Sequence, residues 1–140
     1  VYFALMASQD QVLRAGANAP ETRWSPVRGD GVGERLAFDH ADLLRAALAR
    51  LRSKVEYTSL PVFLLPPEFT LTQLQTIYEV ILGRELEKKS FRTRMLAAEI
   101  LEPLARHQVG ANRPAQLYRA KRRRTPHVFA RPFGSAEPPN

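Results

Sequence analysis

Apolar residues recur at intervals of three and four along several parts of the chain, and shorter β-prone runs lie between these parts. From Leu43 to Leu51 the leucines and alanines follow this spacing, which is typical of a helix with one buried face. Asp39 precedes the run as a good N-cap, and Asp42 can act as its capping-box partner. The pattern predicts a helix from about residue 40 to residue 54.

A second helix is predicted at residues 71–82. Thr70 and Gln73 have the T-x-x-Q spacing of a capping box, in which each side chain bonds the backbone of the other residue. Gly83 suits the left-handed conformation that commonly ends a helix. One face of this helix is apolar and should pack on a core; it consists of Leu74, Ile77, Tyr78 and Ile81.

A basic helix follows within residues 88–101, KKSFRTRMLAAEIL, and we expect it to start at Glu87 or Lys88. Two β-prone runs come next, at 100–108 and 115–124, around a turn rich in Gly, Asn and Pro. Helix, short turn, basic helix and β-hairpin is the order of a winged helix-turn-helix. This part of the chain is therefore expected to be an α+β domain that binds DNA.

The remaining segments carry weaker patterns. Residues 1–7 and 22–27 read as short strands, and 28–34 reads as a plain loop without the residues of a phosphate-binding motif. Residues 58–69 contain three prolines, which favour an extended connector packed between two modules. The tail at 125–140 has four prolines and few aliphatic residues, so it cannot form a core, although it can lie along one. Because the chain starts without methionine inside a strand-like run, we expect residues to be missing upstream.

Composition narrows the classes of function to be considered. The 140 residues contain no cysteine, which excludes disulfides, cysteine-ligated zinc and thiol catalysis and fits a cytoplasmic protein. No apolar run approaches the roughly 20 residues that a membrane-spanning helix needs. The formal net charge is +7, and residues 84–124 hold 12 Lys and Arg against 4 Asp and Glu, whereas the rest holds 9 against 10. This local basic field suggests a polyanion such as nucleic acid, with a solvated basic surface as the alternative.

The basic helix has two distinct sides on a helical wheel. Phe91, Met95 and Ala98 fall on the side that should pack against the preceding helix. The opposite side carries small or polar side chains, Lys89, Ser90, Thr93 and Ala97, and is flanked by Arg92 and Arg94. Arg suits bidentate contact to guanine, Ser and Thr suit either base edge, and Lys suits phosphate. Lysines in a first turn oppose the helix dipole, which a bound polyanion would offset. An amphipathic helix with a solvated basic face is the alternative.

The predicted hairpin is also basic, as expected of a wing that lies over the DNA backbone. Arg106, His107, Arg113 and the run 121–124 surround it, although that run can also be read as a basic tail alone. The candidate DNA-contacting residues are Lys88, Lys89, Ser90, Arg92, Thr93 and Arg94 in the helix, and Arg106, Arg113, Arg119 and Lys121 in the hairpin.

Three blocks of the sequence closely resemble the C-terminal half of Nudix-related transcriptional regulators, in which a Nudix-like domain is followed by a winged helix. They are LAFDHADLLRAALARLRSKVEYTSL, LLPPEFTLTQLQTIYEVILGRELEKKSFRTRML and NRPAQLYR, which occur in the family's order within residues 23–120. The resemblance implies that residues 1–56 are the C-terminal remnant of the Nudix-like α/β domain and 57–69 a proline-containing connector. Residues 70–124 would then be the winged helix-turn-helix and 125–140 a proline-rich tail.

The resemblance also implies a function. Proteins of this family are repressors of genes for NAD metabolism or sugar use, and their Nudix-like part senses ADP-ribose or a related nucleotide. The winged helix would bind a palindromic operator on double-stranded DNA, usually as a homodimer, with Lys88–Arg94 as the recognition helix and GANRPAQ as the wing tip. No cofactor is expected in this chain, because its share of the effector pocket would be incomplete unless a partner chain supplied the rest.

Related chains include active Nudix hydrolases, so a catalytic site must be considered. The segment Arg84–Lys89 imitates the core of the Nudix box, G-x5-E-x7-R-E-U-x-E-E-x-G-U, whose glutamates hold a divalent metal. However, Lys88 and Lys89 occupy two glutamate positions, and Thr76 and Thr70 occupy the earlier Glu and Gly positions. We therefore expect neither a metal site nor catalytic residues in this chain. The alternatives to a DNA-binding regulator are a hydrolase with its catalytic box upstream and an accessory winged helix, and a winged helix used only for protein contacts.

Overall fold

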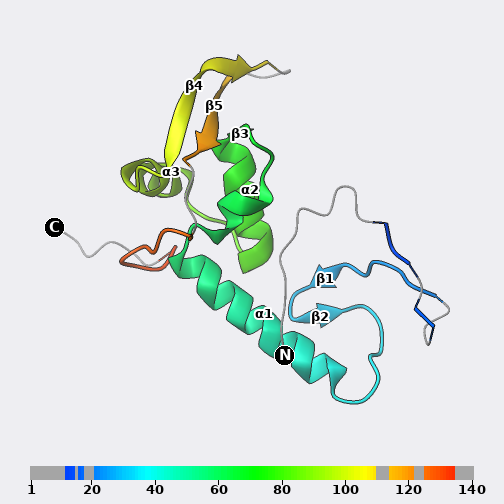
Figure 1. The fold of residues 1–140 in the computed structure, drawn as a ribbon. Helices are drawn as coiled ribbons and strands as arrows, with labels where there is room; N and C mark the ends of the chain where they lie inside the picture. The colour runs from blue at the N-terminus through cyan, green and yellow to red at the C-terminus, as the bar shows by residue number, and fades with distance from the viewer. Residues whose placement is uncertain (1–11, 15, 18–20, 110–113, 122–124, 135–140) are drawn as a thin grey trace. The chain divides into compact units, whose positions relative to one another are not determined.

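The computed structural model describes residues 12–14, 16–17, 21–109, 114–121 and 125–134. The chain divides into two compact units, residues 1–50 and residues 51–140, which are considered in turn. Helix α1 (His40–Tyr57) begins in the first unit and ends in the second (Figure 1). None of the helices within the described residues is long and apolar enough to cross a bilayer.

A short antiparallel hairpin precedes α1 in the first unit. Its strands are β1 (Val27–Arg28) and β2 (Gly31–Val32), and Gly29 turns the chain between them with a φ of 60°. The plain loop predicted at 28–34 is therefore wrong in part, because the tight turn lets its flanking residues pair. The strand predicted at 1–7 lies outside the described residues.

The strand predicted at 22–27 is wrong except at its last residue. Pro26 has no backbone N–H to donate to a neighbouring strand. Upstream of it, the Arg23 guanidinium (2.7 Å) and the Ser25 hydroxyl (3.0 Å) both donate to the carboxylate of Glu34, so this segment is held by side chains. None of the described residues before position 51 is buried.

Helix α1 confirms the predicted start and runs slightly beyond the predicted end, to Tyr57. The backbone N–H groups of Asp42 and Leu43 donate to the Asp39 carbonyl at 3.0 Å, which begins the helix at the predicted cap. The carboxylate of Asp42, predicted to complete a capping box, accepts a hydrogen bond from Arg45. Near the C-terminal end of the helix, Val55 is fully buried in the second unit.

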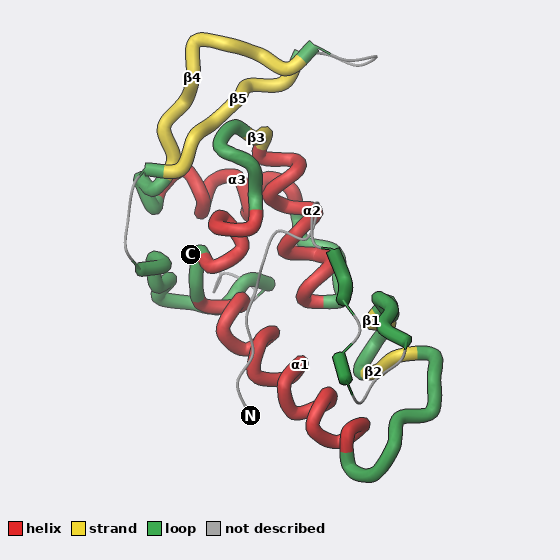
Figure 2. Tube along the Cα trace, turned by 45° about the vertical axis from the view of Figure 1, so that its right-hand side comes forward, coloured by secondary structure: helices red, strands yellow, loops and turns green. Residues whose placement is uncertain are grey.

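The second unit is a winged helix-turn-helix, as predicted. After α1 the chain forms the 3-10 helix η1 (Leu60–Leu64), β3 (Phe69–Thr70), α2 (Leu71–Leu82), α3 (Lys88–Ala97), β4 (Leu101–Gln108) and β5 (Ala115–Ala120). The strands form an antiparallel sheet in the order β3-β5-β4. The β4–β5 hairpin extends away from α2 and α3 as the wing (Figures 1 and 2).

Two features of this unit differ from the sequence-based expectation. The connector predicted to be extended contains η1, because Pro61 in the first turn already has the φ that a helix start requires. Pro61 and Val62 are buried there. Strand β3 was missed, since two residues show no alternation; Phe69 pairs with Tyr118 and Thr70 with Leu117 of β5. The second wing strand, predicted to reach residue 124, ends at Ala120.

One hydrophobic core joins the elements of the second unit. Its buried members are Val55, Val62, Phe69, Leu71, Leu74, Tyr78, Leu82, Leu86, Phe91, Met95, Ile100, Leu101, Tyr118, Phe129 and Phe133. The tail was expected to lie along a core at most. It contributes two phenylalanines that are themselves core residues, because aromatic rings bury large apolar areas even in a segment with few aliphatic side chains.

Helix α2 confirms both predicted ends. The Thr70 hydroxyl accepts from the Gln73 backbone N–H at 3.2 Å, and the Gln73 side chain accepts from the Thr70 N–H at 2.8 Å. At the other end Gly83 has a φ of 69°, and its N–H donates to the Glu79 carbonyl at 2.8 Å. The two caps define the position at which the chain turns toward α3.

We expect Gly83→Ala to lower the free energy of unfolding by about 1 kcal/mol, measured by urea denaturation. A Cβ at this position would meet nothing nearer than Arg52 at 3.8 Å, so the cost comes from the left-handed backbone. Gly33→Ala is the matched control, because a Cβ there enters open space and the backbone is not left-handed. An equal loss in both variants would contradict this explanation.

Candidate nucleic-acid interface

Glu87 caps the N-terminus of α3. Its carboxylate accepts hydrogen bonds from the backbone N–H groups of Lys89 at 2.8 Å and Ser90 at 2.6 Å. The sequence-based prediction located the helix start but missed this cap, although an acidic residue directly before a helix is a recognisable signal. The cap also offsets the unfavourable placement of Lys88 and Lys89 near the positive end of the helix dipole. The Glu87 cap therefore accounts for the two lysines in the first turn without a bound polyanion, contrary to the expectation from the sequence.

The turn between α2 and α3 is held by a pair of polar side chains that sequence patterns did not reveal. The Glu79 carboxylate accepts from the Leu86 backbone N–H and from the Gln75 amide, both at 2.9 Å. The same Gln75 amide donates to the Leu86 carbonyl at 2.9 Å. The Leu86 N–H, followed by the Gln75 amide, lowers the pKa of Glu79, which favours the ionised acceptor. These bonds fix the backbone that sets the direction of α3.

The inner face of α3 packs as the helical wheel predicts. Phe91 and Met95 are 1% and 0% exposed, and Ala98 is half-buried just after the helix. The Phe91 ring lies edge-on to Tyr78 of α2, with 5.3 Å between the ring centroids. The buried Tyr78 hydroxyl donates to the Thr58 carbonyl at 2.7 Å, so it is satisfied. Helix α3 is therefore attached to α2 through a defined aromatic contact.

The outer face of α3 presents the side chains that the wheel placed there. Lys88, Lys89, Ser90 and Thr93 are exposed, and Arg92 is half-buried. A shallow groove of about 460 Å³ runs along this face, lined by Glu87, Lys88, Lys89, Arg92, Thr93 and Leu96. Apart from the Glu87 carboxylate, which is occupied as the cap of α3, the groove combines cations, a hydroxyl and an aliphatic side chain. These are the groups that contact phosphates, base edges and the thymine methyl in a major groove.

The candidate residues of the wing differ in whether their side chains already have a protein partner. Arg106 forms an ion pair with Glu68, and Arg119 pairs with Glu102 at 2.9 Å. Both arginines remain more than half exposed, and exposed ion pairs contribute little, about 0–1 kcal/mol, so a phosphate can compete for them. Lys121 is exposed at the end of β5. Arg113 and residues 122–124 lie outside the described residues.

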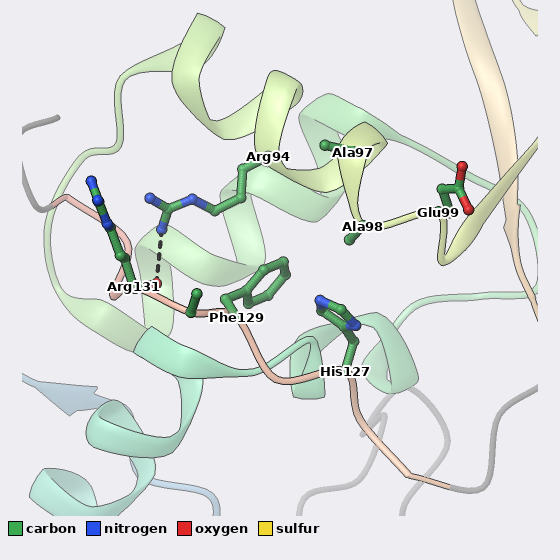
Figure 3. Close-up of a pocket in the computed structure, with 8 residues that line it drawn as sticks. Arg94, Ala97, Ala98, Glu99, His127, Phe129 and Arg131 are labelled. Atoms are coloured by element: carbon green, nitrogen blue, oxygen red, sulfur yellow. Dashed lines mark hydrogen bonds between the residues drawn. The ribbon is translucent and has the colours of Figure 1, made fainter. Parts of the chain in front are cut away.

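Arg94 is placed differently from the other candidates. Its Nη1 donates to the carbonyls of Arg131 (3.1 Å) and Pro132 (2.7 Å) in the C-terminal segment. Its guanidinium carbon lies 4.9 Å from the centre of the Phe133 ring. Figure 3 shows Arg94 reaching from α3 toward this segment, beside a pocket that Phe129 and His127 also line. The structure therefore separates Arg94 from the residues of the outer groove.

Acid should weaken the start of α3 through Glu87. The Ser90 and Lys89 N–H groups lower the pKa of this carboxyl below its ordinary value of about 4.3. Its stabilising effect is therefore complete above that ordinary pKa and is lost as the pH falls through the depressed value. Thermal unfolding midpoints between neutral pH and pH of about 3 should fall less steeply for Glu87→Gln than for the unaltered chain. Glu85→Gln, two residues away, should keep the original profile, and identical profiles for all three proteins would contradict the assignment.

The comparisons with known proteins agree with this geometry. Residues 61–120 match the family described as the NrtR DNA-binding winged helix domain. The ADPR responsive transcriptional repressor NtrR of Acinetobacter baylyi is 47% identical over 122 residues, which cover 85% of this chain and 47% of that protein. Residues 61–120 belong to the NrtR DNA-binding winged helix domain family. Over most of its length the chain is similar to Nudix-related transcriptional regulators. The resemblance found in the sequence is thereby confirmed. The chain spans about half the length of this curated relative.

Solved structures of a Nudix-related regulator show the same fold. The crystal structure of Shewanella oneidensis NrtR complexed with a 27mer DNA has a TM-score of 0.61 and 36% identity to this chain. A second structure of Shewanella oneidensis NrtR has a TM-score of 0.62 and 39% identity. Each match covers 72% of this chain and 46% of the other. The winged helix fold is confirmed, whereas the predicted segment boundaries and the DNA-contacting residues stay predictions.

Proposed function

We propose that this chain is the DNA-binding part of a transcriptional repressor that responds to ADP-ribose or a related nucleotide. The observation that carries the proposal is the outer face of α3, where Lys88, Lys89, Arg92 and Thr93 line one open groove and Ser90 is exposed. A relative described as an ADPR responsive repressor and a NrtR structure that contains DNA support this reading. They favour it over a hydrolase with an accessory winged helix.

In the proposed complex, α3 lies in the major groove of double-stranded DNA. Arg92 has the planar, bidentate group that pairs with the acceptor edge of guanine, and Ser90 and Thr93 suit either kind of base edge. Lys88 and Lys89, at the helix N-terminus, bind phosphate and set the register. The wing reaches the adjacent backbone, where Arg106 of β4, Arg119 of β5 and Lys121 just after β5 meet phosphates. Arg113, in the segment that the family resemblance assigns to the wing tip, is a further candidate. A protein bound in this way excludes the transcription machinery from a promoter.

Several finer features come from the family resemblance. The target is a palindromic operator near genes of NAD or sugar metabolism, bound by a homodimer whose half-sites lie about one helical turn, roughly 10 base pairs, apart. The effector pocket is not assigned to residues of this chain, and a cytoplasmic location stays a prediction. Lys88 and Lys89 at the first turn of α3 leave the apparent Nudix box of Arg84–Lys89 without two of its metal ligands.

A salt titration of DNA binding tests the proposal. The unaltered chain is first used to select a duplex from a randomised pool, and its affinity is then measured by fluorescence anisotropy at several salt concentrations. We expect log K to fall with log salt with a slope of about −3 or steeper for each bound subunit, because each neutralised phosphate contributes about 0.9. A pool that yields no enriched duplex, or a slope near zero, would contradict DNA binding.

A second experiment tests the response to the effector. ADP-ribose should release the duplex from a protein that has the full length of the curated relative, and it should leave binding by the present chain unchanged. Release from both proteins would place the effector site in this chain. That result would contradict the proposal that ADP-ribose binds outside the winged helix part. Adenosine monophosphate is the matched control ligand, because it has the same base and one ribose but lacks the second ribose and the diphosphate bridge.

A further inference from the structure

The end of the described chain is attached to the end of α1 by backbone bonds. We name residues 126–134 the C-terminal strap. Its Phe129 and Phe133 N–H groups donate to the carbonyls of Tyr57 (2.7 Å) and Glu56 (3.1 Å). Close by, the Ser59 N–H donates to the His127 carbonyl at 2.9 Å, and the Ser59 hydroxyl accepts from the His127 N–H at 2.8 Å. The strap is therefore anchored along several residues.

The strap also enters the aromatic core under α3. Phe133 is 3% exposed, and its ring centre lies 5.6 Å from that of Phe91 on α3 and 4.8 Å from that of Tyr78 on α2. Phe129 packs against Phe133 with 5.0 Å between ring centres. Aromatic contacts of this geometry contribute beyond the apolar area that they bury. One strap ring thus touches both helices of the helix-turn-helix.

Two arginines complete the attachment. Arg84, in the turn after α2, donates to the Phe133 carbonyl at 2.6 Å and to the Glu56 carboxylate at 3.0 Å. Arg94 of α3 donates to two strap carbonyls and lies over the Phe133 ring. Figure 3 shows the bond to the Arg131 carbonyl. The Arg94 guanidinium would lose its two carbonyl acceptors and its contact with the aromatic ring if it moved to bind a DNA phosphate. These contacts therefore keep it on the strap.

We infer that the C-terminal strap holds α3 in its DNA-reading position, and that Arg94 supports DNA binding through the strap without touching DNA. This inference rests on the proposed function. Phe91 and Met95 are the buried residues of α3, so a third attachment through Arg94 restrains rotation of the helix about its axis. Because the strap is anchored at Glu56 and Tyr57, it also links the position of α3 to the end of α1. Arg94 is thus a positioning residue.

Charge-preserving and charge-removing variants separate the two roles of Arg94. Lysine keeps the positive charge but lacks the planar group that stacks on Phe133. If Arg94 acts through the strap, Arg94→Lys should weaken binding to the selected duplex about fivefold or more, as Arg94→Ala does. The slope of log K against log salt should be unchanged in both. A direct phosphate contact predicts near-normal affinity for Arg94→Lys and a slope reduced by about 1 for Arg94→Ala, and either result would overturn the inference.

A double-mutant cycle tests whether Arg94 and the strap act together. Phe133→Leu keeps an apolar side chain in the core but removes the ring on which Arg94 lies. We expect the variant with both Arg94→Ala and Phe133→Leu to bind DNA about as well as the single variant that has the lower affinity. The reason is that both changes remove the same contact, between the Arg94 guanidinium and the Phe133 ring. Full additivity of the two losses would overturn the inference. Arg45→Ala and Phe63→Leu are the matched controls, since Arg45 is exposed on α1 and Phe63 is half exposed on η1.

Amide hydrogen exchange gives a readout that does not depend on DNA. In the free chain, Arg94→Lys and Phe133→Leu should both accelerate exchange in α3, because the helix loses its third attachment. The control variants should leave it unchanged. If the unaltered chain selects no duplex, the proposed DNA-binding function is wrong, but hydrogen exchange still tests the role of the strap. Faster exchange in the variants supports that role, and unchanged exchange overturns it.

Discussion

Arg92→Ala should lower the affinity for the selected duplex by about 10- to 100-fold, the range expected for losing one bidentate base contact. Arg92 borders the outer groove of α3 and is the arginine of that helix that does not bind the strap. Because its role is to distinguish a base, binding to a random duplex should weaken much less. The ratio of specific to non-specific affinity, measured by anisotropy at one salt concentration, should therefore shrink.

Lys89→Ala is the matched control for this prediction. Lys89 lines the same groove and lies one turn earlier on α3, but its compact ammonium suits a phosphate. Its removal should weaken binding to both duplexes equally and should reduce the salt slope by about 1. If Arg92→Ala instead lowered both affinities by the same factor, Arg92 would be a phosphate contact and the base-reading role would be wrong.

Phe91→Ala should lower the free energy of unfolding by about 3–5 kcal/mol, a large part of the stability of a small domain. The side chain is 1% exposed and makes ring contacts with Tyr78 and Phe133, so its loss leaves a cavity between α2, α3 and the strap. Urea denaturation followed by circular dichroism measures the change.

Leu96→Ala provides the comparison for Phe91→Ala. Leu96 lies on the same helix but is 47% exposed, so truncating it should change the free energy of unfolding by less than about 1 kcal/mol. Similar losses from the two truncations would show that the inner and outer faces of α3 are assigned wrongly. That result would also undermine the outer face as a DNA-contacting surface.

The features that sequence reasoning predicted well are those encoded by neighbouring residues. The capping box of Thr70 and Gln73 defines the start of α2, and Gly83 defines its end. Each signal acts on the backbone within a few residues of itself, so its meaning does not depend on the rest of the fold. The wheel of α3 separates Phe91 and Met95 from Lys89 and Thr93 for the same reason. The order of these elements was sufficient to predict the winged helix.

The features that sequence reasoning missed depend on contacts between distant residues. Strand β3 exists because Phe69 meets Tyr118 across the sheet, and two residues are too few to show a period. The strap is a core element because Phe133 meets Phe91 and Tyr78, which lie far away in the sequence. Arg94 looked equivalent to Arg92 on the wheel, and the strap distinguishes them.

A site-specific crosslink tests the central claim, that the outer face of α3 lies against base edges. The chain contains no cysteine, so Thr93→Cys introduces a unique thiol in the groove of α3. The Thr93→Cys protein is mixed with a set of selected duplexes. In each duplex a different single base carries a disulfide-bearing tether in the major groove. We expect rapid crosslinking at one or a few positions and little with a scrambled duplex, whereas Val80→Cys, 75% exposed on α2, should stay unlinked. Crosslinking from Val80→Cys with none from Thr93→Cys would contradict the account.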